Sequence, residues 1–410
     1  MSESDTYLNN NPLHVNTEPV NGSYIMLDNE KYYKISNYDQ MRPFFISLVS
    51  HSDHWLFLSS NGGITAGRKD ENQALFPYYT DDKILKNAEN TGSKSIFRVI
   101  KNNRTFLWEP FSCLYEGVYP IKRNIYKNFY GNKIFFEEIN KELNLTFRYK
   151  WQLSEKYGFI KSSELENLNS KQVTVEIIDG IQNVLPYGVS ASLQNNTSNL
   201  VNAYKKNELV SIVNLGIFSL SSMIIDKAEP SEALKATTVW STGIKSTHIL
   251  LSDLQINNFR KGQKIKTETD IRAEPGSYFI KSRINLNKKQ TCQWHIVAEV
   301  NQDHAKIFKL IENLKTKPDN IIQSLKDDIK KGMNSLKKLV CMSDGLQRSD
   351  DEMSVGRHYS NVLFNIMRGG IFQDQYCIDK KDFIKHVVAA NKQIKNECRD
   401  FFSQIGRAHV

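Results

Sequence analysis

Two tyrosines stand one residue before two aspartates in the segment ALFPYYTDDK, at Ala74–Lys83. Tyrosine rings can stack on the C–H face of a sugar, and carboxylates accept hydrogen bonds from its hydroxyls. Because neighbouring residues of a strand point to opposite faces, Asp81 and Asp82 are poorly placed to act as a catalytic pair. We therefore expect a turn with solvated carboxylates here, beside Tyr78 and Tyr79 as candidate sugar contacts.

A glycine-rich stretch precedes this segment and reads SSNGGITAGR, at Ser59–Arg68. It lacks the Lys-Ser/Thr pair of a phosphate-binding P-loop, and its glycine spacing differs from that of a dinucleotide fingerprint. Gly and Asn are common turn residues, so the sequence favours a β-turn after a strand at Trp55–Leu58 over a ligand-binding loop.

The segment FNIMRGGIFQDQY, at Phe364–Tyr376, predicts a helix that runs into a Gly-Gly turn. Arg368 at this turn could bind an anion such as phosphate. A helix C-terminus repels anions, however, and attracts arginine for its own sake, so both interpretations stay open. Elsewhere, the Asp-Gly and Pro-Tyr-Gly elements of Asp179–Gly188 indicate turns with a purely structural role.

Composition excludes several classes of protein. The chain has 410 residues and a net charge of +9, but its lysines alternate with acidic residues, which argues against a nucleic-acid partner. We find no signal peptide and no run of about 18 apolar residues, so we expect no membrane association. Five cysteines at scattered spacings and isolated histidines predict a cytoplasmic protein with no metal site and no cofactor.

Alternation of apolar and polar residues with a period of two dominates from Tyr24 to about Val300. Leu145–Trp151 is a clear case, and Val173–Ile177 repeats the pattern before an expected turn at Asp179-Gly180. The number of short strands predicts a mainly β fold with a large antiparallel super-sandwich. The segment Tyr187–Glu208 interrupts it with helical spacing of Val189, Leu193, Leu200, Val201 and Tyr204, which indicates an edge helix.

After Asn301 the apolar residues recur with helical spacing instead. Two stripes predict amphipathic helices that lie on another surface; they consist of Ile307, Leu310, Ile311 and Leu314, and of Ile322, Leu325, Ile329, Met333, Leu336 and Val340. A third helix is expected at His358–Met367, and a fourth with Asp379 or Asp382 as its N-cap.

The last six residues, IGRAHV, have a genetic explanation. The codons ATC-GGA-AGA-GCA-CAC-GTC-TGA encode them with a stop, and this string begins a common sequencing adapter. We expect residues 404–410 to be adapter-encoded and the native reading frame to continue past Gln404. Amplification of the source gene beyond that codon tests this hypothesis.

Four motifs in a fixed order resemble the inverting carbohydrate phosphorylases of the cellobiose phosphorylase type, including long bacterial β-1,3-oligoglucan phosphorylases. They are SSNGGITAGRKDENQALFPYYTDDKI at Ser59–Ile84, YGNKIFFEEIN at Tyr130–Asn140, DGIQNVLPYGV at Asp179–Val189 and DKAEPSEALKA at Asp226–Ala236. The resemblance covers residues 24 to 402. It implies phosphorolysis of a β-glucosidic bond to a sugar 1-phosphate, with inorganic phosphate as co-substrate and a single catalytic acid.

The resemblance also implies a plan for the chain. This plan has a β-super-sandwich at 24–300, a helical linker at 301–345 and the start of a truncated (α/α)6 barrel at 346–403. Outside it we expect a loosely attached or disordered arm at 1–23, from its polar composition, and the adapter-encoded tail at 404–410. The fragment itself would be inactive, because the catalytic acid of such enzymes lies deeper in the barrel. Asp374 matches that motif only superficially, since the expected preceding arginine is missing.

Substrate contacts favoured by the resemblance are Arg68, Tyr78 and Tyr79, because sandwich loops in this family reach the active site of a neighbouring subunit. Arg368 joins them as a candidate substrate contact because of its residue type, as a possible phosphate ligand. A homodimer and an oligosaccharide substrate of the full-length enzyme are implied as well. Two alternatives stay open: a free-standing carbohydrate-binding β-sandwich, and the front end of a glycoside hydrolase on the same scaffold. Phosphate-dependent release of glucose 1-phosphate would separate them.

Overall fold

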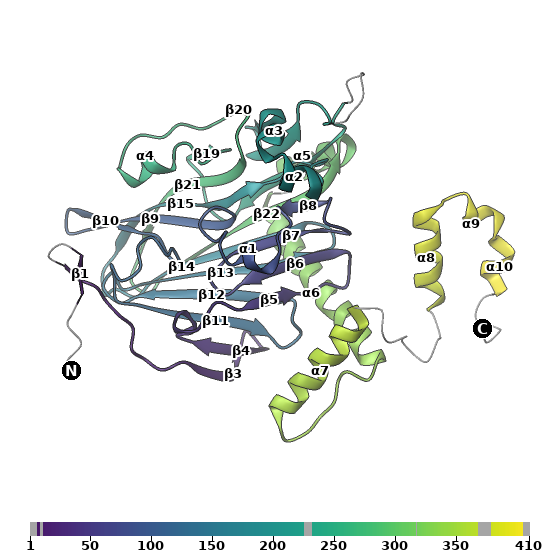
Figure 1. Cartoon of the computed structure of the whole chain (residues 1–410), viewed down its shortest axis with the longest axis horizontal. Coiled ribbons are helices and arrows are strands. Elements are labelled where there is room, and N and C mark those ends of the chain that lie inside the picture. The colour runs from purple at the N-terminus through teal and green to yellow at the C-terminus, as the bar shows by residue number, and fades with distance from the viewer. Residues whose placement is uncertain (1–5, 9–10, 225–231, 317, 368–378, 405–410) are drawn as a thin grey trace. The chain divides into compact units, whose positions relative to one another are not determined.

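The computed structural model describes residues 6–8, 11–224, 232–316, 318–367 and 379–404. Antiparallel β-structure fills the chain as far as Asp303, and helices follow (Figure 1). The predicted mainly β class is confirmed. Two compact units are present, Met1–Gly332 and Met333–Val410, and each is described by itself. None of the helices in the described ranges is long and apolar enough to span a lipid bilayer.

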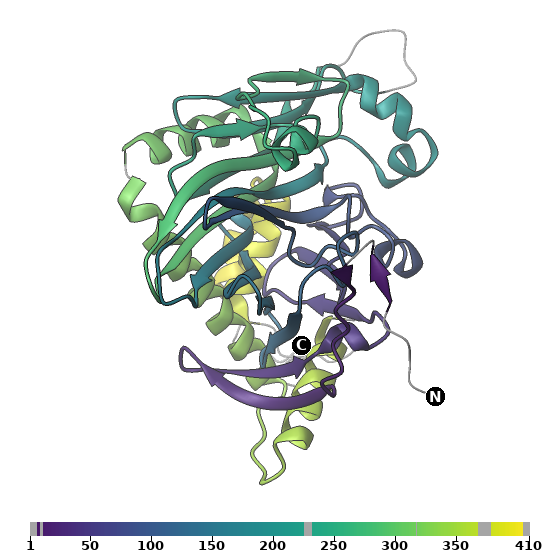
Figure 2. The ribbon, with the colours of Figure 1, turned by 90° about the vertical axis from the view of Figure 1, so that its left-hand side faces the viewer.

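The largest sheet has 11 strands, all paired antiparallel, in the order β20-β16-β17-β18-β22-β14-β13-β12-β11-β4-β3. Their bounds are β3 Asn21–Leu27, β4 Glu30–Ser36, β11 Ile121–Asn128, β12 Lys133–Asn140, β13 Leu145–Ser154, β14 Gly158–Asn167, β16 Lys205–Val210, β17 Leu215–Leu220, β18 Lys235–Thr242, β20 Asp270–Arg272 and β22 Thr291–Asp303. Figure 2 shows this sheet from the side.

Two smaller sheets share the core of the large one, so the predicted large sandwich is confirmed with a second layer that is split in two. The five-stranded sheet has the order β10-β9-β15-β21-β19, and the four-stranded sheet the order β5-β6-β7-β8. Their bounds are β5 Phe45–Leu48, β6 His54–Ser59, β7 Ile64–Arg68, β8 Ala74–Phe76, β9 Gly92–Lys101, β10 Arg104–Trp108, β15 Val173–Val184, β19 His248–Leu250 and β21 Gly276–Leu286.

Short elements complete this unit. They are the pair β1 Tyr7–Leu8 and β2 Asn11–Pro12, the 3-10 helix η1 Tyr38–Gln40, and the helices α1 Asp81–Ile84 and α4 Ile256–Arg260.

The core forms where the alternation of the sequence predicts it. Along β13 the odd-numbered side chains Phe147, Tyr149 and Trp151 are buried, while Arg148 and Lys150 between them are partly exposed. Phe147 packs in one cluster with Phe97 of the five-stranded sheet and Leu58 of the four-stranded sheet. One hydrophobic core therefore holds all three sheets together.

The turn expected at Asp179-Gly180 is wrong, because β15 runs straight through both residues. Asp179 is fully buried, and four donors satisfy its carboxylate: Lys161 Nζ at 2.5 Å, Ser95 Oγ at 2.5 Å, Trp294 Nε1 at 2.7 Å and Ser163 Oγ at 3.0 Å. Gly180 lies so close to β21 that an added Cβ would be 2.1 Å from the carbonyl oxygen of Tyr278. Partners on neighbouring strands thus override the local turn preference.

The predicted edge helix is present as two short helices, α2 Ala191–Asn196 and α3 Ser198–Tyr204. Ser190 caps α2 by accepting a hydrogen bond from the Leu193 backbone N–H. Val201 is buried in a cluster that also includes Val189, whereas Leu200 is exposed.

Two helices follow the last strand, α5 His304–Thr316 and α6 Pro318–Met342. The apolar residues of the predicted stripes up to Ile329 pack on Trp240, Val297 and Ile160, on the face of the large sheet that is turned away from the core. The Tyr157 hydroxyl and Ser324 Oγ, 2.7 Å apart, add a polar contact. The prediction that these helices lie on another surface is confirmed.

The second unit contains the end of α6 and the helices α7 Glu352–Met367, α8 Lys380–Ala390, α9 Ile394–Glu397 and α10 Arg399–Gln404. Asp379 caps α8 by accepting hydrogen bonds from two backbone N–H groups. Of the two predicted N-caps, Asp379 and Asp382, the first is therefore confirmed. The start of an (α/α)6 barrel is not confirmed by these helices and stays a prediction.

Candidate functional site

The predicted site residues have different locations. Arg68, Tyr78 and Tyr79 lie on or just beyond the four-stranded sheet. Arg368 and the weak candidate Asp374 fall outside the described residues, so their predicted roles stay predictions.

Tyr78 belongs to a row of aromatic rings on the four-stranded sheet, which we call the aromatic strip. Its members are Phe45, Phe57, Trp55 and Tyr78. The ring centroids of Phe45 and Phe57 are 5.4 Å apart and nearly parallel, those of Phe57 and Trp55 are 6.2 Å apart and nearly parallel, and Tyr78 meets Trp55 edge-on at 5.6 Å. Phe45 is 49% exposed and Tyr78 39%.

The alternation of β6 produces this strip. Leu56 and Leu58 are fully buried in the core, so Trp55 and Phe57 between them point away from it. Gly67 pairs with Trp55 across the sheet, and an added Cβ there would lie 2.4 Å from the indole ring. The indole therefore lies over the glycine, and its Nε1 donates to the Asp70 carbonyl at 3.1 Å. Both contacts hold the ring in place.

Arg68, at the end of β7, ties the four-stranded sheet to the large one. It donates to both carboxylate oxygens of Glu299 at 2.9 and 2.6 Å, to Asp53 Oδ1 at 2.7 Å and to the Glu155 carbonyl at 2.9 Å. A bidentate arrangement of this kind fixes the orientation of a guanidinium. The structure gives Arg68 a structural role, and its predicted contact with substrate stays a prediction.

Tyr79 turns away from the aromatic strip. Burial raises the pKa of its hydroxyl, which lies within hydrogen-bonding reach of the Asn183 and Thr91 side chains. After Thr80, Asp81 and Asp82 begin the one-turn helix α1 rather than lie in an open turn. The two tyrosines thus differ: Tyr78 is exposed beside the aromatic strip, and Tyr79 is half-buried.

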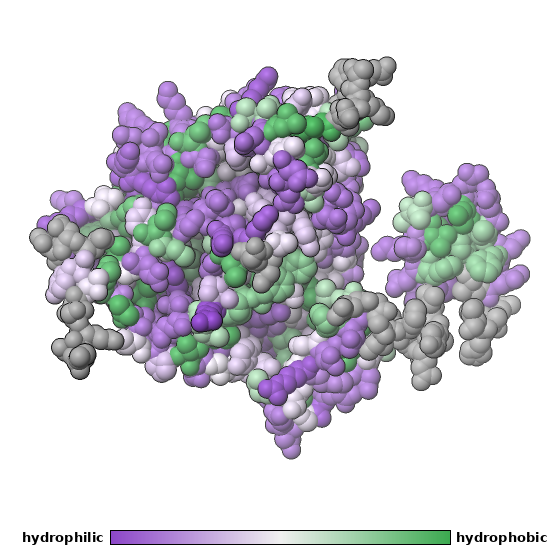
Figure 3. Space-filling view, viewed as in Figure 1, coloured by the Kyte–Doolittle hydropathy of each residue, from purple (hydrophilic) through white to green (hydrophobic). Residues whose placement is uncertain are grey.

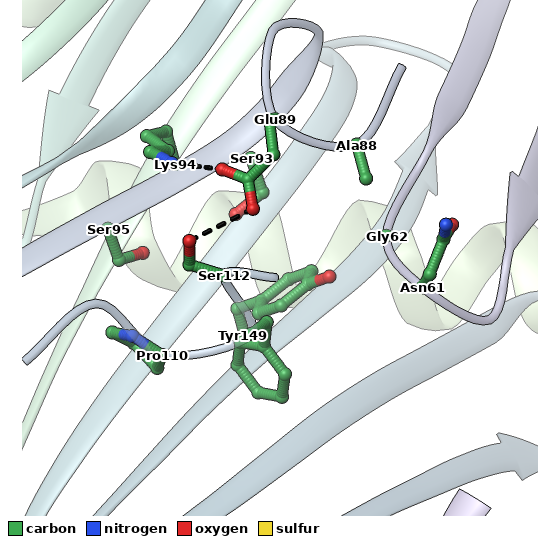
Figure 4. Close-up of a pocket in the computed structure, with 11 residues that line it drawn as sticks. Asn61, Gly62, Ala88, Glu89, Ser93, Lys94, Ser95, Pro110, Ser112 and Tyr149 are labelled. Atoms are coloured by element: carbon green, nitrogen blue, oxygen red, sulfur yellow. Dashed lines mark hydrogen bonds and ion pairs between the residues drawn. The ribbon is translucent and has the colours of Figure 1, made fainter. Parts of the chain in front are cut away.

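A small pocket opens where the three sheets meet, and we call it the seam pocket (Figure 4). It is lined by Asn61 and Gly62 of the β6–β7 turn, Ala88 and Glu89 after α1, Ser93, Lys94 and Ser95 of β9, Pro110, Phe111 and Ser112 after β10, and Tyr149 of β13. Its volume is about 20 Å³, which is room for one small polar group.

Charges on one wall of the seam pocket are paired in a chain. Glu89 accepts from Lys94 Nζ at 2.5 Å, from Ser112 Oγ at 2.9 Å and from the Cys113 N–H at 2.6 Å. Lys94 also faces Glu109 at 3.3 Å, and Arg260 binds Glu109 with two hydrogen bonds. Burial alone would raise the pKa of Glu89, but the bond from Lys94 holds it below its ordinary value.

Of the aromatic strip, only Tyr78 was predicted from the sequence as a candidate contact, and no residue of the seam pocket was. Trp55 and Phe57 are two residues apart in an alternating strand, and this spacing could have indicated the aromatic strip. The lining of the seam pocket comes from five separate segments, and no local motif joins Tyr149 to Glu89. Asn61 and Gly62 were part of a stretch expected to be a turn, which β6 and β7 confirm.

No protein-family model matches the chain, and no curated protein matches it. Among solved structures, a bacterial glucoamylase complexed with acarbose has a TM-score of 0.42 and 11% identity, over 80% of this chain and 40% of that one. A protein from the human microbiome assigned as a kojibiose phosphorylase has a TM-score of 0.34 and 10% identity, over 66% and 30%. A protein from Klebsiella pneumoniae assigned as an aldose 1-epimerase has a TM-score of 0.33 and 9% identity, over 72% of this chain and 92% of that one.

The chain thus spans less than half the length of the glucoamylase and of the microbiome protein. With TM-scores of 0.42 and lower, these likenesses do not establish a common fold.

Proposed function

We propose that this chain is the N-terminal, non-catalytic part of a carbohydrate-active enzyme, and specifically of a glycoside phosphorylase. The parent enzyme would cleave β-glucosidic bonds with inorganic phosphate and release a sugar 1-phosphate. Two lines support this proposal: the order of the four sequence motifs, and a sandwich followed by helices as the resemblance implies. The aromatic strip is the single structural observation that carries the carbohydrate part of the proposal.

The strip fits a glucan chain for physical reasons. In β-glucosides the equatorial hydroxyls leave both faces of the pyranose ring lined with C–H groups, which pack on aromatic faces. Phe45, Phe57 and Trp55 form a row of three partly or well exposed rings in mutual contact, with neighbouring ring planes 29° apart. Gly67 and the Asp70 carbonyl fix the indole before any ligand arrives, so little conformational entropy is lost on binding.

Titration of this chain with β-1,3- and β-1,4-linked glucose oligosaccharides, followed by calorimetry, tests the strip. We expect Tyr78→Ala and Phe45→Ala each to weaken binding about threefold to tenfold, because each removes one ring contact. Both side chains are well exposed, so the fold should tolerate the changes. Phe308→Ala removes an aromatic ring that is 63% exposed on α5 and serves as the matched control. Equal binding by all four proteins would contradict the proposal.

The proposed reaction is tested on a gene product that continues beyond the codon for Gln404, as the adapter hypothesis expects. Incubation with the oligosaccharides should release glucose 1-phosphate only when inorganic phosphate is present. Hydrolysis that proceeds without phosphate would overturn phosphorolysis in favour of a glycoside hydrolase. If the full-length protein binds the oligosaccharides but cleaves them neither with phosphate nor with water, a carbohydrate-binding module would be favoured.

A further inference from the structure

Tyr149 stands out in the seam pocket because its ring is held firmly while its hydroxyl has no protein partner. The side chain is 3% exposed, stacks on Phe136 at 4.9 Å and meets Phe111 edge-on at 5.1 Å. Within the described part of the chain, no side chain or backbone group hydrogen-bonds its hydroxyl. Figure 4 shows that hydroxyl directed toward the turn of Asn61 and Gly62.

The backbone of the β6–β7 turn keeps the space above this hydroxyl open. Gly62 has a φ of +98°, and a Cβ added to it would lie 3.4 Å from the Tyr149 oxygen. Burial raises the pKa of Tyr149 well above its ordinary value, so the phenol stays protonated and can both donate and accept a hydrogen bond. The hydroxyl is not among the fully buried polar atoms that lack a partner, so it borders the open space of the pocket and can bond a ligand group that enters it.

The wall of the seam pocket that carries Glu89 and Lys94 has no net charge that would attract an ion. Glu89 and Glu109 are balanced by Lys94 and Arg260, so this chain of four charged groups is neutral as a whole. Their directed bonds leave a rigid polar wall, on which Ser112 and Glu89 offer further lone pairs. Such a wall beside an aromatic floor suits a neutral hydroxyl group rather than a phosphate or a metal ion.

We propose that the seam pocket binds the hydroxymethyl arm of a hexopyranoside. The volume of about 20 Å³ excludes a whole sugar ring but accepts one hydroxyl on its carbon. The hydroxyl would exchange hydrogen bonds with Tyr149 and with the Glu89–Ser112 wall, while the ring stays at the mouth. The choice of a sugar rests on the proposed function; the preference for a neutral primary alcohol rests on the pocket alone.

Two matched ligands test the proposal: methyl β-D-glucopyranoside, and methyl β-D-xylopyranoside, which lacks only the hydroxymethyl arm. Titrations of the whole chain followed by saturation-transfer NMR should show that the xyloside binds at least about tenfold more weakly. Tyr149→Phe should weaken binding of the glucoside about fivefold or more and leave that of the xyloside unchanged. Its melting temperature should change little, because the hydroxyl that is removed bonds no group of the described protein.

Tyr278→Phe is the matched control. Tyr278 is equally buried, but its hydroxyl donates to the Asn214 carbonyl at 2.6 Å, and it does not line the pocket. This variant should melt earlier and bind the glucoside normally. Equal affinity for the two glycosides, or unchanged glucoside binding by Tyr149→Phe, would overturn the proposal and indicate that the pocket holds water only.

The strip and the pocket can fail separately. Loss of glucoside binding in Tyr78→Ala, with full binding in Tyr149→Phe, would place the monosaccharide on the aromatic strip and overturn the pocket. If the strip variants bind oligosaccharides as well as the unchanged chain does, and Tyr149→Phe still weakens glucoside binding, the proposed function loses its structural support. The pocket proposal is then retained.

Discussion

His54 shows at the scale of one residue how the sandwich fixes a charge state. Its ring is 7% exposed, meets Phe159 edge-on at 5.1 Å, and its Nδ1 lies 2.8 Å from Ser52 Oγ. Burial, followed by the nearby positive charge of Arg68, lowers the pKa of His54 to about 3. The imidazole is therefore neutral in the folded protein at every pH where the protein is normally handled.

This lowered pKa predicts acid sensitivity. In the unfolded chain a histidine takes up a proton near pH 6.5, whereas folded His54 resists it down to about pH 3. Stability is thus complete above pH 6.5 and is lost as the pH falls through this window, by about 2 kcal/mol at pH 5. Urea unfolding at pH 7 and pH 5 measures it. His54→Gln should reduce the difference, and an unchanged difference in this variant would contradict the assignment.

Residue types indicated sugar chemistry, but they did not indicate which side chains face solvent. Tyr78 and Tyr79 are adjacent and were equal candidates, yet one joins Trp55 on the surface and the other turns toward Asn183. Arg68 looked available in the sequence, and Glu299, more than 200 positions away, takes up two of its donors. Such partners depend on strand register, which local sequence does not determine.

Strand β15 shows the same limit at the scale of an element. Alternation predicted its first half from Val173 to Ile177, because one face of that part packs on the core. Its second half carries Asp-Gly, which is a turn signal in most sequences. Only the donors from β9, β14 and β22 make a buried aspartate acceptable in the middle of a strand.

Asp179 should therefore be essential for the stability of the sandwich. Asp179→Ala leaves the fully buried Lys161 without its counterion, and we expect a loss of about 3 to 5 kcal/mol in the free energy of unfolding. Lys161→Met with Asp179→Leu in one chain should recover part of that loss, because two apolar groups replace an ion pair. Denaturant titrations compare the variants. A loss below about 1 kcal/mol in Asp179→Ala would show that the pair contributes little.

At the scale of the whole molecule, the helical stripes were the most predictable feature, since a period of 3.6 is visible in the sequence alone. Their partner was not predictable: α5 and α6 pack on Ile160, Trp240 and Val297, strand residues whose side chains point away from the main core. In the sequence these three strands therefore carry apolar residues on both faces. That pattern is typical of strands covered on both sides.

This second covering layer predicts where the chain can be shortened. A chain that ends after Gly332 keeps every α5 and α6 residue that packs on the large sheet, whereas one that ends after Asp303 exposes Trp240 and Val297 to water. We expect the shorter chain to lose on the order of 5 kcal/mol of stability, because several large side chains lose their burial. It should also bind a hydrophobic dye. Equal melting temperatures of the two chains in calorimetry would show that the helices do not stabilise the sandwich. The helical segment would then have to be retained for a reason other than stability.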